Sequence, residues 1–193
     1  MQILYEDEDI VVCVKPVGVD SEHELPALLG PQIYTLHRLD QNVGGVMVYA
    51  KNKSSAALFS QMIREGGLVK EYVAMIHGTP PAEGDWEDLL FKDSRKNKVF
   101  TVKKQRAGVK KARLTYKLIR AGERSAVRIR LYTGRSHQIR VQFSSRGFPL
   151  VGDHKYGSKA KETAPMLWSC CLKFPHNGRE LCIEKLPDWL PSE

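Results

Sequence analysis

A histidine, an arginine and a carboxylate stand close together at His37–Asp40, directly before a glycine-rich turn that ends at Gly45. The apolar run Val46–Ala50 follows at once and predicts a buried strand. A carboxylate that a rigid strand holds in place can serve as a nucleophile or a base. Asp40 is therefore the first candidate for chemistry in this chain.

A second polar segment runs from Gly134 to Arg140, where a strand is expected to end and a helix to begin near Ser136. The first turn of a helix offers free backbone N–H groups, which suit an anion such as phosphate. Arg135 and Arg140 would add positive charge there. It is equally consistent with the sequence that Ser136 only caps the helix and that both arginines face solvent.

The chain has 193 residues and a formal net charge of +8, and the excess is local. The segment Lys92–Arg113 carries ten basic residues against Asp93 alone, which sums to +9 and leaves −1 for the rest of the chain. A local basic stripe fits a phosphate-rich partner. A solvated basic face with no ligand explains the charge alone equally well.

The hydrophobic pattern predicts strands with a few helices between them, and hence an α+β fold with a largely antiparallel sheet. Residues 80–112 are expected to form weak strands at best, and one domain is expected to cover residues 1–193. The expected elements are strands at 10–14, 46–50 and 71–77, a loop with one short helical turn at most at 21–34, a helix starting at Ser54 or Ser55 and ending at Gly66, a hairpin of 112–119 with 126–132, a helix at 136–145, and a strand pair of 166–173 with 180–184.

Several classes of protein are unsupported. The motifs G-x-G-x-x-G, G-x-x-x-x-G-K-[ST], H-E-x-x-H and G-x-S-x-G are absent, so no dinucleotide, P-loop, zincin or esterase site is expected. Neither the six histidines nor the four cysteines show metal-ligand spacing, so no metal is expected. With no apolar run near the roughly 18 residues of a membrane span and no signal-peptide pattern, we expect a cytoplasmic protein without membrane contact.

Taken in order along the chain, five motifs resemble the RluA-like family of RNA pseudouridine synthases, over nearly the whole sequence. They are the opening segment Tyr5–Gly18, the catalytic motif His37–Asp40 with Ala50-Lys51, the active-site tyrosine segment Val69–Ala74, the arginine motif Thr133–Val141, and the segment Pro149–Gly157. The resemblance implies the family's catalytic fold, a mixed, largely antiparallel sheet with a central cleft and flanking helices. It also implies a catalytic domain alone, without the S4-type RNA-binding domain of many members.

The resemblance also assigns roles. Asp40 would be the nucleophile or base on a flipped-out uridine, and Arg140 its ion-pair partner, with Arg135 as the second choice. Tyr72 would stack on the uracil, unless it is only a core aromatic on its strand. The reaction isomerises its substrate, so it needs no cofactor.

The partner implied is RNA, either a ribosomal or a transfer RNA stem-loop, bound by a protein that we expect to be a monomer. Arg38 would be a wedge or phosphate anchor beside the flipped base, whereas His37 is expected to make a structural hydrogen bond to the backbone. Arg135 and His137, in the arginine motif, would also contact the RNA. Lys96, Lys98, Lys103 and Lys104 would follow the RNA backbone.

Two places depart from the family pattern. Val43-Gly44 replace the usual hydroxyl residues after the aspartate, and Leu167-Trp168-Ser169 replaces a Leu-His-Ala pattern. Two alternative functions follow from the sequence. One is an RNA-binding protein of this fold that is catalytically weak or inactive. The other is a nucleosidase or glycosidase that uses Asp40, which would need a second carboxylate such as Glu8, Asp9 or Asp153.

Overall fold

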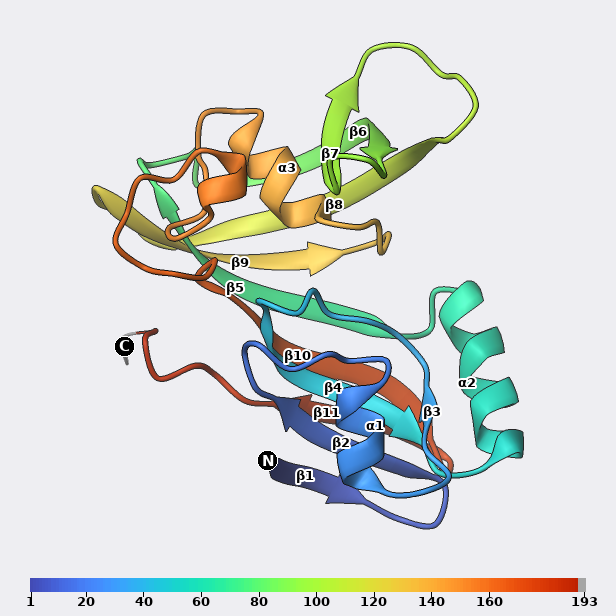
Figure 1. Cartoon of the computed structure of the whole chain (residues 1–193). Helices are drawn as coiled ribbons and strands as arrows, with labels where there is room; N and C mark the ends of the chain where they lie inside the picture. Colours follow the sequence, from blue (N-terminus) through green and yellow to red (C-terminus); the bar gives the residue numbers. More distant parts are fainter. Residues whose placement is uncertain (191–193) are drawn as a thin grey trace. The chain divides into compact units, whose positions relative to one another are not determined.

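The computed structural model describes residues 1–190, and its chain divides into two compact units. Unit 1 contains Met1–Glu71 and the chain from Trp168 onward, and unit 2 contains Tyr72–Leu167 (Figure 1). Each unit is described by itself below. The expectation of a single domain over residues 1–193 stays a prediction.

Unit 1 is built on a mixed sheet in the order β1-β2-β4-β10, with β3 on β4 and β11 on β10. Only the pairing of β4 with β10 is parallel; the others are antiparallel. The strands are β1 (Gln2–Glu6), β2 (Ile10–Lys15), β3 (Tyr34–Thr35), β4 (Gly44–Ala50), β10 (Leu167–His176) and β11 (Arg179–Glu184).

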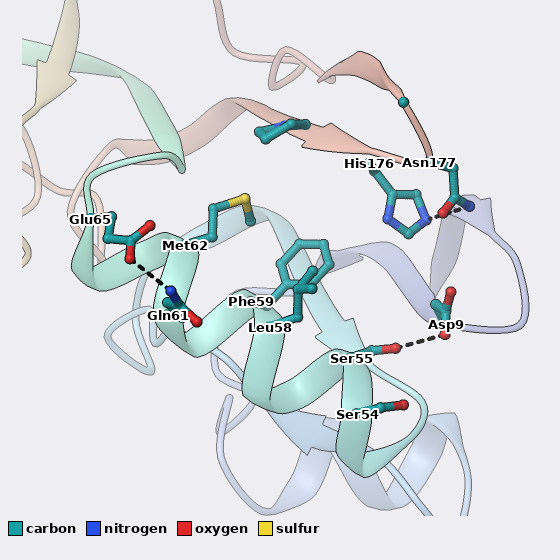
Figure 2. A pocket seen from close by; sticks show the side chains of 12 residues that line it. Asp9, Ser54, Ser55, Leu58, Phe59, Gln61, Met62, Glu65, His176 and Asn177 are labelled. Atoms are coloured by element: carbon teal, nitrogen blue, oxygen red, sulfur yellow. Dashed lines mark hydrogen bonds between the residues drawn. The ribbon is translucent and has the colours of Figure 1, made fainter.

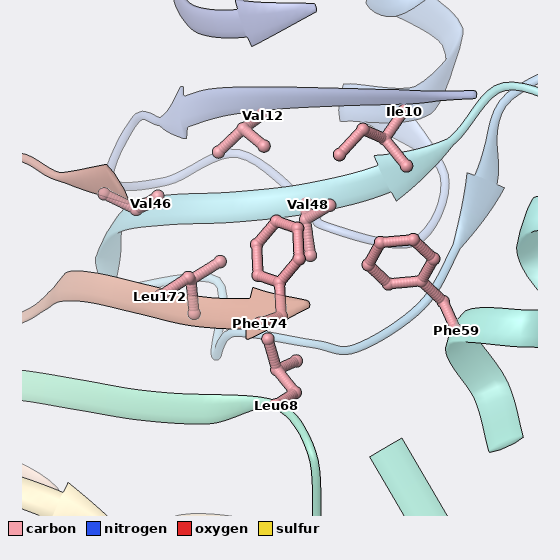
Figure 3. Packing of buried hydrophobic residues seen from close by; sticks show 8 residues of the cluster. All are labelled: Ile10, Val12, Val46, Val48, Phe59, Leu68, Leu172 and Phe174. Carbon is pink, nitrogen blue, oxygen red and sulfur yellow. The ribbon is translucent and has the colours of Figure 1, made fainter. Parts of the chain in front are cut away.

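The core of unit 1 forms where alternate residues of the central strands point to one face of the sheet. β4 is buried along its whole length, as its unbroken apolar run predicts. Phe59 of the long helix packs edge-on against Phe174 of β10, with the ring centroids 5.3 Å apart. Figure 3 shows this cluster, whose members are Ile10, Val12, Val46, Val48, Phe59, Leu68, Leu172 and Phe174.

Two helices belong to unit 1: α1 (Glu24–Leu29) and α2 (Lys53–Arg64). The sequence placed the N-cap of the second helix at Ser54 or Ser55, which is wrong. Asn52 is the N-cap, because its side-chain oxygen accepts the backbone N–H of Ser55 at 2.9 Å. α1 is the short helical turn expected within 21–34.

Unit 2 is built on strands in the order β5-β9-β8-β6-β7, of which the pairs β9–β8, β8–β6 and β6–β7 are antiparallel. Their bounds are β5 (Val69–His77, most of it in this unit), β6 (Glu83–Asp93), β7 (Lys98–Val102), β8 (Val109–Arg120) and β9 (Arg124–Leu131). The expected hairpin of 112–119 with 126–132 is confirmed by the β8–β9 pair. The expectation of weak strands at best over 80–112 is wrong, because β6 alone has 11 residues.

The hydrophobic pattern of the sequence did not reveal the strands of the basic segment, because one face of the sheet is exposed to solvent and carries charged residues. Trp86, Ala112 and Leu114 alternate with the charged residues Asp85, Glu87, Lys111 and Arg113, so the mean polarity of these strands is high although one face is packed. The helix α3 (Gln138–Ser144) covers that face, with Phe143 against Trp86 at a centroid distance of 4.7 Å.

The expected helix at 136–145 and the expected strand pair of 166–173 with 180–184 are both confirmed in type and place. Together with the mixed, largely antiparallel strands, they confirm the α+β class. A single-turn 3₁₀ helix at His154–Tyr156 completes the elements of the described residues.

Candidate active site

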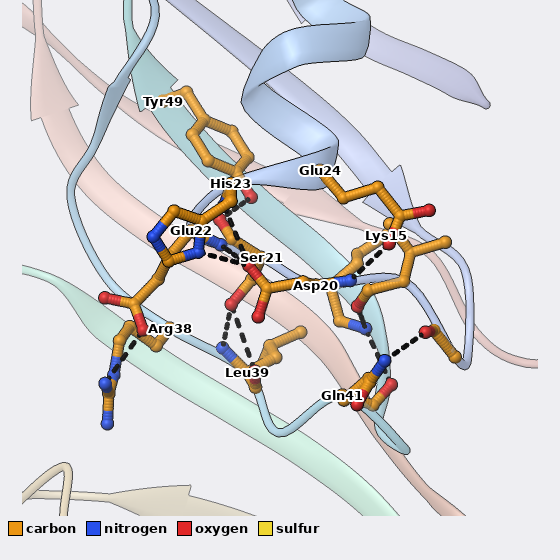
Figure 4. Close-up of polar contacts among 12 residues, drawn as sticks. Lys15, Asp20, Ser21, Glu22, His23, Glu24, Arg38, Leu39, Gln41 and Tyr49 are labelled. Atoms are coloured by element: carbon orange, nitrogen blue, oxygen red, sulfur yellow. Dashed lines mark hydrogen bonds and ion pairs between the residues drawn. The ribbon is translucent and has the colours of Figure 1, made fainter.

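Asp40 lies in unit 1, on a turn directly before β4, and its carbonyl oxygen accepts the backbone N–H of Val43 at 2.9 Å. Leu39, the residue before it, is buried, and one hydroxyl group bonds to both its backbone N–H and its backbone carbonyl. Ser21 Oγ accepts the Leu39 N–H at 3.3 Å and donates to the Leu39 carbonyl at 3.1 Å (Figure 4). The chain that carries Asp40 is therefore anchored to the loop before α1.

Lys15 fixes the other side of this turn. It is fully buried, and its Nζ donates to three carbonyl oxygens, those of Pro16 at 2.9 Å, Val19 at 2.7 Å and Gln41 at 3.0 Å. Gly18 reinforces the link, because its N–H donates to the Gln41 carbonyl at 2.8 Å. All three N–H groups of the ammonium are used, so Lys15 clamps the loop after β2 to the residue after Asp40 (Figure 4).

Burial lowers the pKa of Lys15 to about 8, although the negative charges of Asp20, Asp40 and Glu24 act in the opposite direction. The sequence analysis gave Lys15 no role beyond its place in the opening motif. The signal was available: a lysine continues an apolar strand and stands directly before Pro16. A charged residue in such a strand needs partners when it is buried.

Gly44 and Trp168, the two departures from the family pattern, are register partners in the parallel pair of β4 with β10. A Cβ atom on Gly44 would lie 2.4 Å from the Trp168 ring and 3.1 Å from the Lys15 carbonyl oxygen. The Trp168 indole N–H donates to the carbonyl of Lys185 at 2.8 Å, which fixes the ring in this place. The indole therefore occupies the space that any larger residue at position 44 would need.

Gly45 is required for a different reason. Its φ is +127°, and an added Cβ would lie 2.3 Å from the Ser169 carbonyl oxygen. Ser169 itself is buried and donates its hydroxyl to the Val46 carbonyl at 3.0 Å. The start of β4 is thus tightly packed against β10 at both glycines.

The expected structural role of His37 is confirmed, because its Nε2 accepts the backbone N–H of Val48 at 3.2 Å. Its pKa is lowered to about 3 by burial and by the nearby positive charge of Lys70. His37 is therefore neutral at physiological pH. Arg38, the next residue, is exposed and forms an ion pair with Glu22 at 2.9 Å.

In unit 2, Arg140 is buried on α3 and pairs with Asp153 through two hydrogen bonds, at 2.6 Å from Nε and 2.9 Å from Nη2. Its guanidinium carbon also lies 5.1 Å from the centroid of the Tyr156 ring. Asp153 is 1 % exposed, and its buried carboxylate is held by the two hydrogen bonds from Arg140. The sequence named Asp153 only as a possible acid and did not predict this pair. The pairing of Arg140 with Asp40 stays a prediction.

The start of α3 is organised by Gln138, and the expectation that Ser136 caps this helix is wrong. The Gln138 side-chain oxygen accepts the N–H of Arg135 at 3.0 Å, and the N-cap position is His137 in a left-handed conformation. His137 Nδ1 lies 2.9 Å from the Tyr156 hydroxyl. The same hydroxyl oxygen accepts the backbone N–H of Val99. Arg135 is exposed, and its Nε donates to the Lys111 carbonyl at 2.8 Å.

Tyr72 begins unit 2 on β5 and is buried, at 6 % exposure. That Tyr72 stacks on the uracil stays a prediction, and so does the alternative that it is only a core aromatic on its strand. Among the four lysines assigned to RNA, Lys96, Lys103 and Lys104 are exposed near the β6–β7 and β7–β8 connections. Lys98 differs, because it is half-buried with its Nζ 5.3 Å from the Tyr156 ring centroid.

The residues predicted for the site fall into two sets, one in each unit. Arg38 and Asp40 belong to unit 1, and the other predicted site residues belong to unit 2. The structure gives the surroundings of each set separately. The residues that sequence reasoning missed are Lys15 and Trp168 in unit 1 and the arginine partner role of Asp153 in unit 2.

A pocket of about 650 Å³ in unit 1 lies between α2 and the turn that joins β10 to β11 (Figure 2). None of the predicted site residues lines it. His176, on its wall, bonds through Nε2 to Asp7 at 2.7 Å. Burial would raise the pKa of Asp7, but this bond and the backbone N–H groups of Ile10 and Asp9 lower it well below its usual range.

None of the helices within residues 1–190 has the length and apolar character needed to cross a membrane. Nor do His, Cys, Asp and Glu side chains gather there in groups of three or more that could hold a metal ion.

Comparisons with known proteins agree on one family. A family model described as RNA pseudouridylate synthase matches residues 9–145. The dual-specificity RNA pseudouridine synthase RluA of Escherichia coli (strain K12) is 34% identical over 188 residues, which cover 86% of this chain and 81% of that protein. The ribosomal large subunit pseudouridine synthase D of Borreliella burgdorferi is 31% identical over 178 residues, which cover 80% of this chain and 54% of that protein.

The chain thus spans about half the length of the ribosomal large subunit relatives that it matches. Among solved structures, human RNA pseudouridylate synthase domain containing 1 superposes with a TM-score of 0.87 at 24% identity, covering 98% of this chain and 84% of that one. At this identity the likeness shows the fold, and it confirms the catalytic fold that the resemblance implied.

Proposed function

This chain belongs to the RNA pseudouridylate synthase family, and from that premise we propose that it converts uridine in RNA to pseudouridine, with Asp40 as the nucleophile or base. The observation that carries the proposal is the fixed position of Asp40. The turn that bears it is held by Ser21 on one side and by Lys15 on the other. Such fixing is what a reacting group needs in order to meet its substrate in one geometry.

The reaction breaks the bond between uracil N1 and ribose C1′, turns the base, and joins C5 to C1′. The proton on C5 leaves and N1 gains one, so the product has the same composition as the substrate. An ionised carboxylate can attack C1′ or the uracil ring, or remove a sugar proton, and each route begins with Asp40. No oxidant or energy carrier enters this balance.

The target uridine has to leave its stack, at a cost of a few kcal/mol that is smallest in loops and bulges. We assign Arg38 to the vacated position or to a nearby phosphate. Its only described partner is Glu22, and both side chains are exposed. Little free energy is therefore needed to separate Arg38 from Glu22. Tyr72 is assigned to the uracil face, and Arg140 to the charge balance of Asp40.

The RNA is proposed to be ribosomal or transfer RNA. One relative is named for the ribosomal large subunit, which supports the ribosomal choice, and another is named for dual specificity toward RNA. We expect the protein to act as a monomer in the cytoplasm. Arg135, His137, Lys96, Lys98, Lys103 and Lys104 are the proposed contacts to the RNA outside the target uridine.

The hydrolytic alternative is weakened at two of its three candidate acids, Asp9 and Asp153. Both oxygens of Asp153 accept hydrogen bonds from Arg140, so its carboxylate is committed to that pair. Hydrogen bonds from Asn52 and Ser55 lower the pKa of Asp9, which disfavours the protonated form that a general acid needs. The alternative of a weak or inactive RNA-binding protein is addressed by the experiment below.

The test is to incubate the purified protein with total RNA that carries tritium at C5 of uridine and to identify the products. We expect tritium release together with pseudouridine at defined positions. Free uracil would instead indicate a hydrolase, and RNA binding without tritium release would indicate the inactive alternative. Either result would overturn the proposal.

A further inference from the structure

Tyr132 directly follows β9 and presents an aromatic ring to solvent, with 48% of the residue exposed. Two arginines lie over this ring. The guanidinium carbon of Arg113 is 4.6 Å from the ring centroid, and that of Arg130 is 5.3 Å away. A half-exposed tyrosine with two guanidinium groups presents both a stacking surface and positive charge.

Arg113 and Tyr132 are held in place. Arg113 donates from Nε and Nη2 to the two carboxylate oxygens of Asp85, at 3.0 and 2.7 Å. The backbone N–H of Tyr132 donates to the Arg113 carbonyl at 3.1 Å, and the Arg113 N–H donates to Thr133 Oγ1 at 2.9 Å. The ring and one guanidinium group are therefore positioned before any ligand binds.

Arg130 is different. It is exposed, and within the described residues the structure gives it no carboxylate partner. Within the part of the chain that the structure describes, the Tyr132 ring is the contact given for its side chain. Arg130 is thus able to leave the ring for a phosphate oxygen at little cost.

The neighbouring charge is positive. Lys111, Arg113 and Lys117 of β8 share a face with Arg130 of β9, because Thr115 pairs with Arg130 and side chains alternate along each strand. Arg135 joins them through its bond to the Lys111 carbonyl. The opposing carboxylates on β6 are Glu83, whose register partner is Lys117, Asp85, which is bonded to Arg113, and Glu87, which lies 3.7 Å from Lys111.

We propose that Tyr132, Arg113 and Arg130 form a stacking platform for a second, unpaired base of the RNA, distinct from the target uridine. The base stacks on the Tyr132 ring, Arg113 stays in place, and Arg130 moves to a phosphate beside that base. Stacking tolerates any base, so the platform contributes affinity and register and no sequence choice. This inference rests on the proposed function only in naming RNA as the ligand.

The experiment uses two fluorescent probes, a short oligouridylate and an abasic ribose-phosphate oligomer of the same length. They carry the same phosphates, so only stacking separates them. The wild-type protein should prefer the oligouridylate. Tyr132→Ala should weaken its binding by about fivefold or more and leave the abasic probe unchanged, because stacking is worth about 1 kcal/mol or more per base.

Two variants control the result. Tyr132→Phe keeps the ring and should bind as the wild type does. Ile119→Ala shortens another exposed apolar side chain on β8, 42% exposed, and should also leave binding unchanged. The platform is overturned if the wild type shows no preference for the oligouridylate, or if Tyr132→Ala loses affinity equally for both probes or for neither.

Failure of the platform and failure of the proposed function can be told apart. If the wild type makes pseudouridine but Tyr132→Ala binds both probes normally, the platform is wrong and the function stands. If no RNA is modified but the preference for the oligouridylate depends on Tyr132, the platform stands and the catalytic proposal fails.

Discussion

Lys15 is a buried cation whose three ammonium N–H groups all donate to backbone carbonyls around Asp40. Removing the ammonium would take the donor from the carbonyl groups of Pro16 and Val19, whereas the Gln41 carbonyl would keep the N–H of Gly18. Each unsatisfied buried acceptor costs about 1–3 kcal/mol, partly offset here by relief of the buried charge. Lys15 therefore holds the turn that bears Asp40, the proposed nucleophile or base.

We predict that Lys15→Met lowers the free energy of unfolding by about 2–4 kcal/mol, since the carbonyl groups of Pro16 and Val19 lose their donor. It should also lower kcat more than the affinity for RNA, because the Asp40 turn loses its clamp. Urea unfolding and single-turnover kinetics measure these effects. Lys53→Met, at an exposed position, should change stability by less than about 0.5 kcal/mol. A Lys15→Met protein as stable and active as the wild type would contradict the assigned role.

Arg140 illustrates why a motif residue is hard to interpret by mutation alone. Replacing it would leave Asp153 buried without its counter-ion, which typically costs about 3–5 kcal/mol. A loss of activity in Arg140→Met would therefore not by itself show that Arg140 serves Asp40. The sequence identified Arg140 by its motif but could not identify Asp153 as its partner, because thirteen positions separate the two residues.

At the level of elements, the parallel pair of β4 with β10 joins two departures that look unrelated in the sequence. Gly44 and Trp168 lie far apart along the chain and meet only through strand register. No local sequence pattern indicates that Gly44 and Trp168 are neighbours. The glycine-rich turn was predictable from its composition, whereas its reason, the Trp168 ring against Gly44, required the tertiary structure.

We predict that Gly44 and Trp168 are energetically coupled. Gly44→Ala should destabilise the protein by about 1–3 kcal/mol, because its Cβ would overlap the indole ring. In Gly44→Ala/Trp168→His the overlapping ring atoms are gone, so the combined loss should be smaller than the sum of the two single losses. Urea unfolding of the four proteins gives the coupling. Gly122→Ala, which has room for a Cβ, is the control, and strict additivity at Gly44 and Trp168 would contradict the coupling.

The bond between Asp7 and His176 ties β1 to the end of β10 and should make stability depend on pH. Asp7 has a lowered pKa in the folded chain, against about 3.9 when unfolded. Its contribution is therefore present above about pH 4 and is lost as the pH falls below that value. Asp7→Asn should cost about 2 kcal/mol at pH 7 and clearly less at pH 3. Urea unfolding at both pH values decides, and an equal cost at both would contradict the assignment.

For the whole molecule, the composition located the basic excess correctly but misjudged its structure. The segment Lys92–Arg113 looked irregular because charged residues cover the open face of its strands. The class of fold was predictable, since long apolar runs and alternating strands dominate the rest of the chain. The division into two compact units was not, because unit 1 combines Met1–Glu71 with the distant chain from Trp168 onward.

The charged segment leads to a prediction about salt. Changing Lys96, Lys103 and Lys104 to Gln should flatten the dependence of RNA affinity on salt, by about 0.7–0.9 in the log–log slope for each lost phosphate contact. Lys98 is left unchanged because it lies over Tyr156. The same change at Lys53, Lys159 and Lys161, which are exposed elsewhere, is the control and should leave the slope unaltered. An unchanged slope in the first variant would remove this segment from the RNA interface.

The account as a whole depends on Asp40, and Asp40→Asn tests it most directly. The amide keeps the size of the side chain and removes its charge, so the turn held by Lys15 and Ser21 should persist. We predict that the variant unfolds at the same urea concentration as the wild type, binds RNA with the same affinity, and forms no pseudouridine in a single-turnover assay. Pseudouridine formation near the wild-type rate would contradict the central claim.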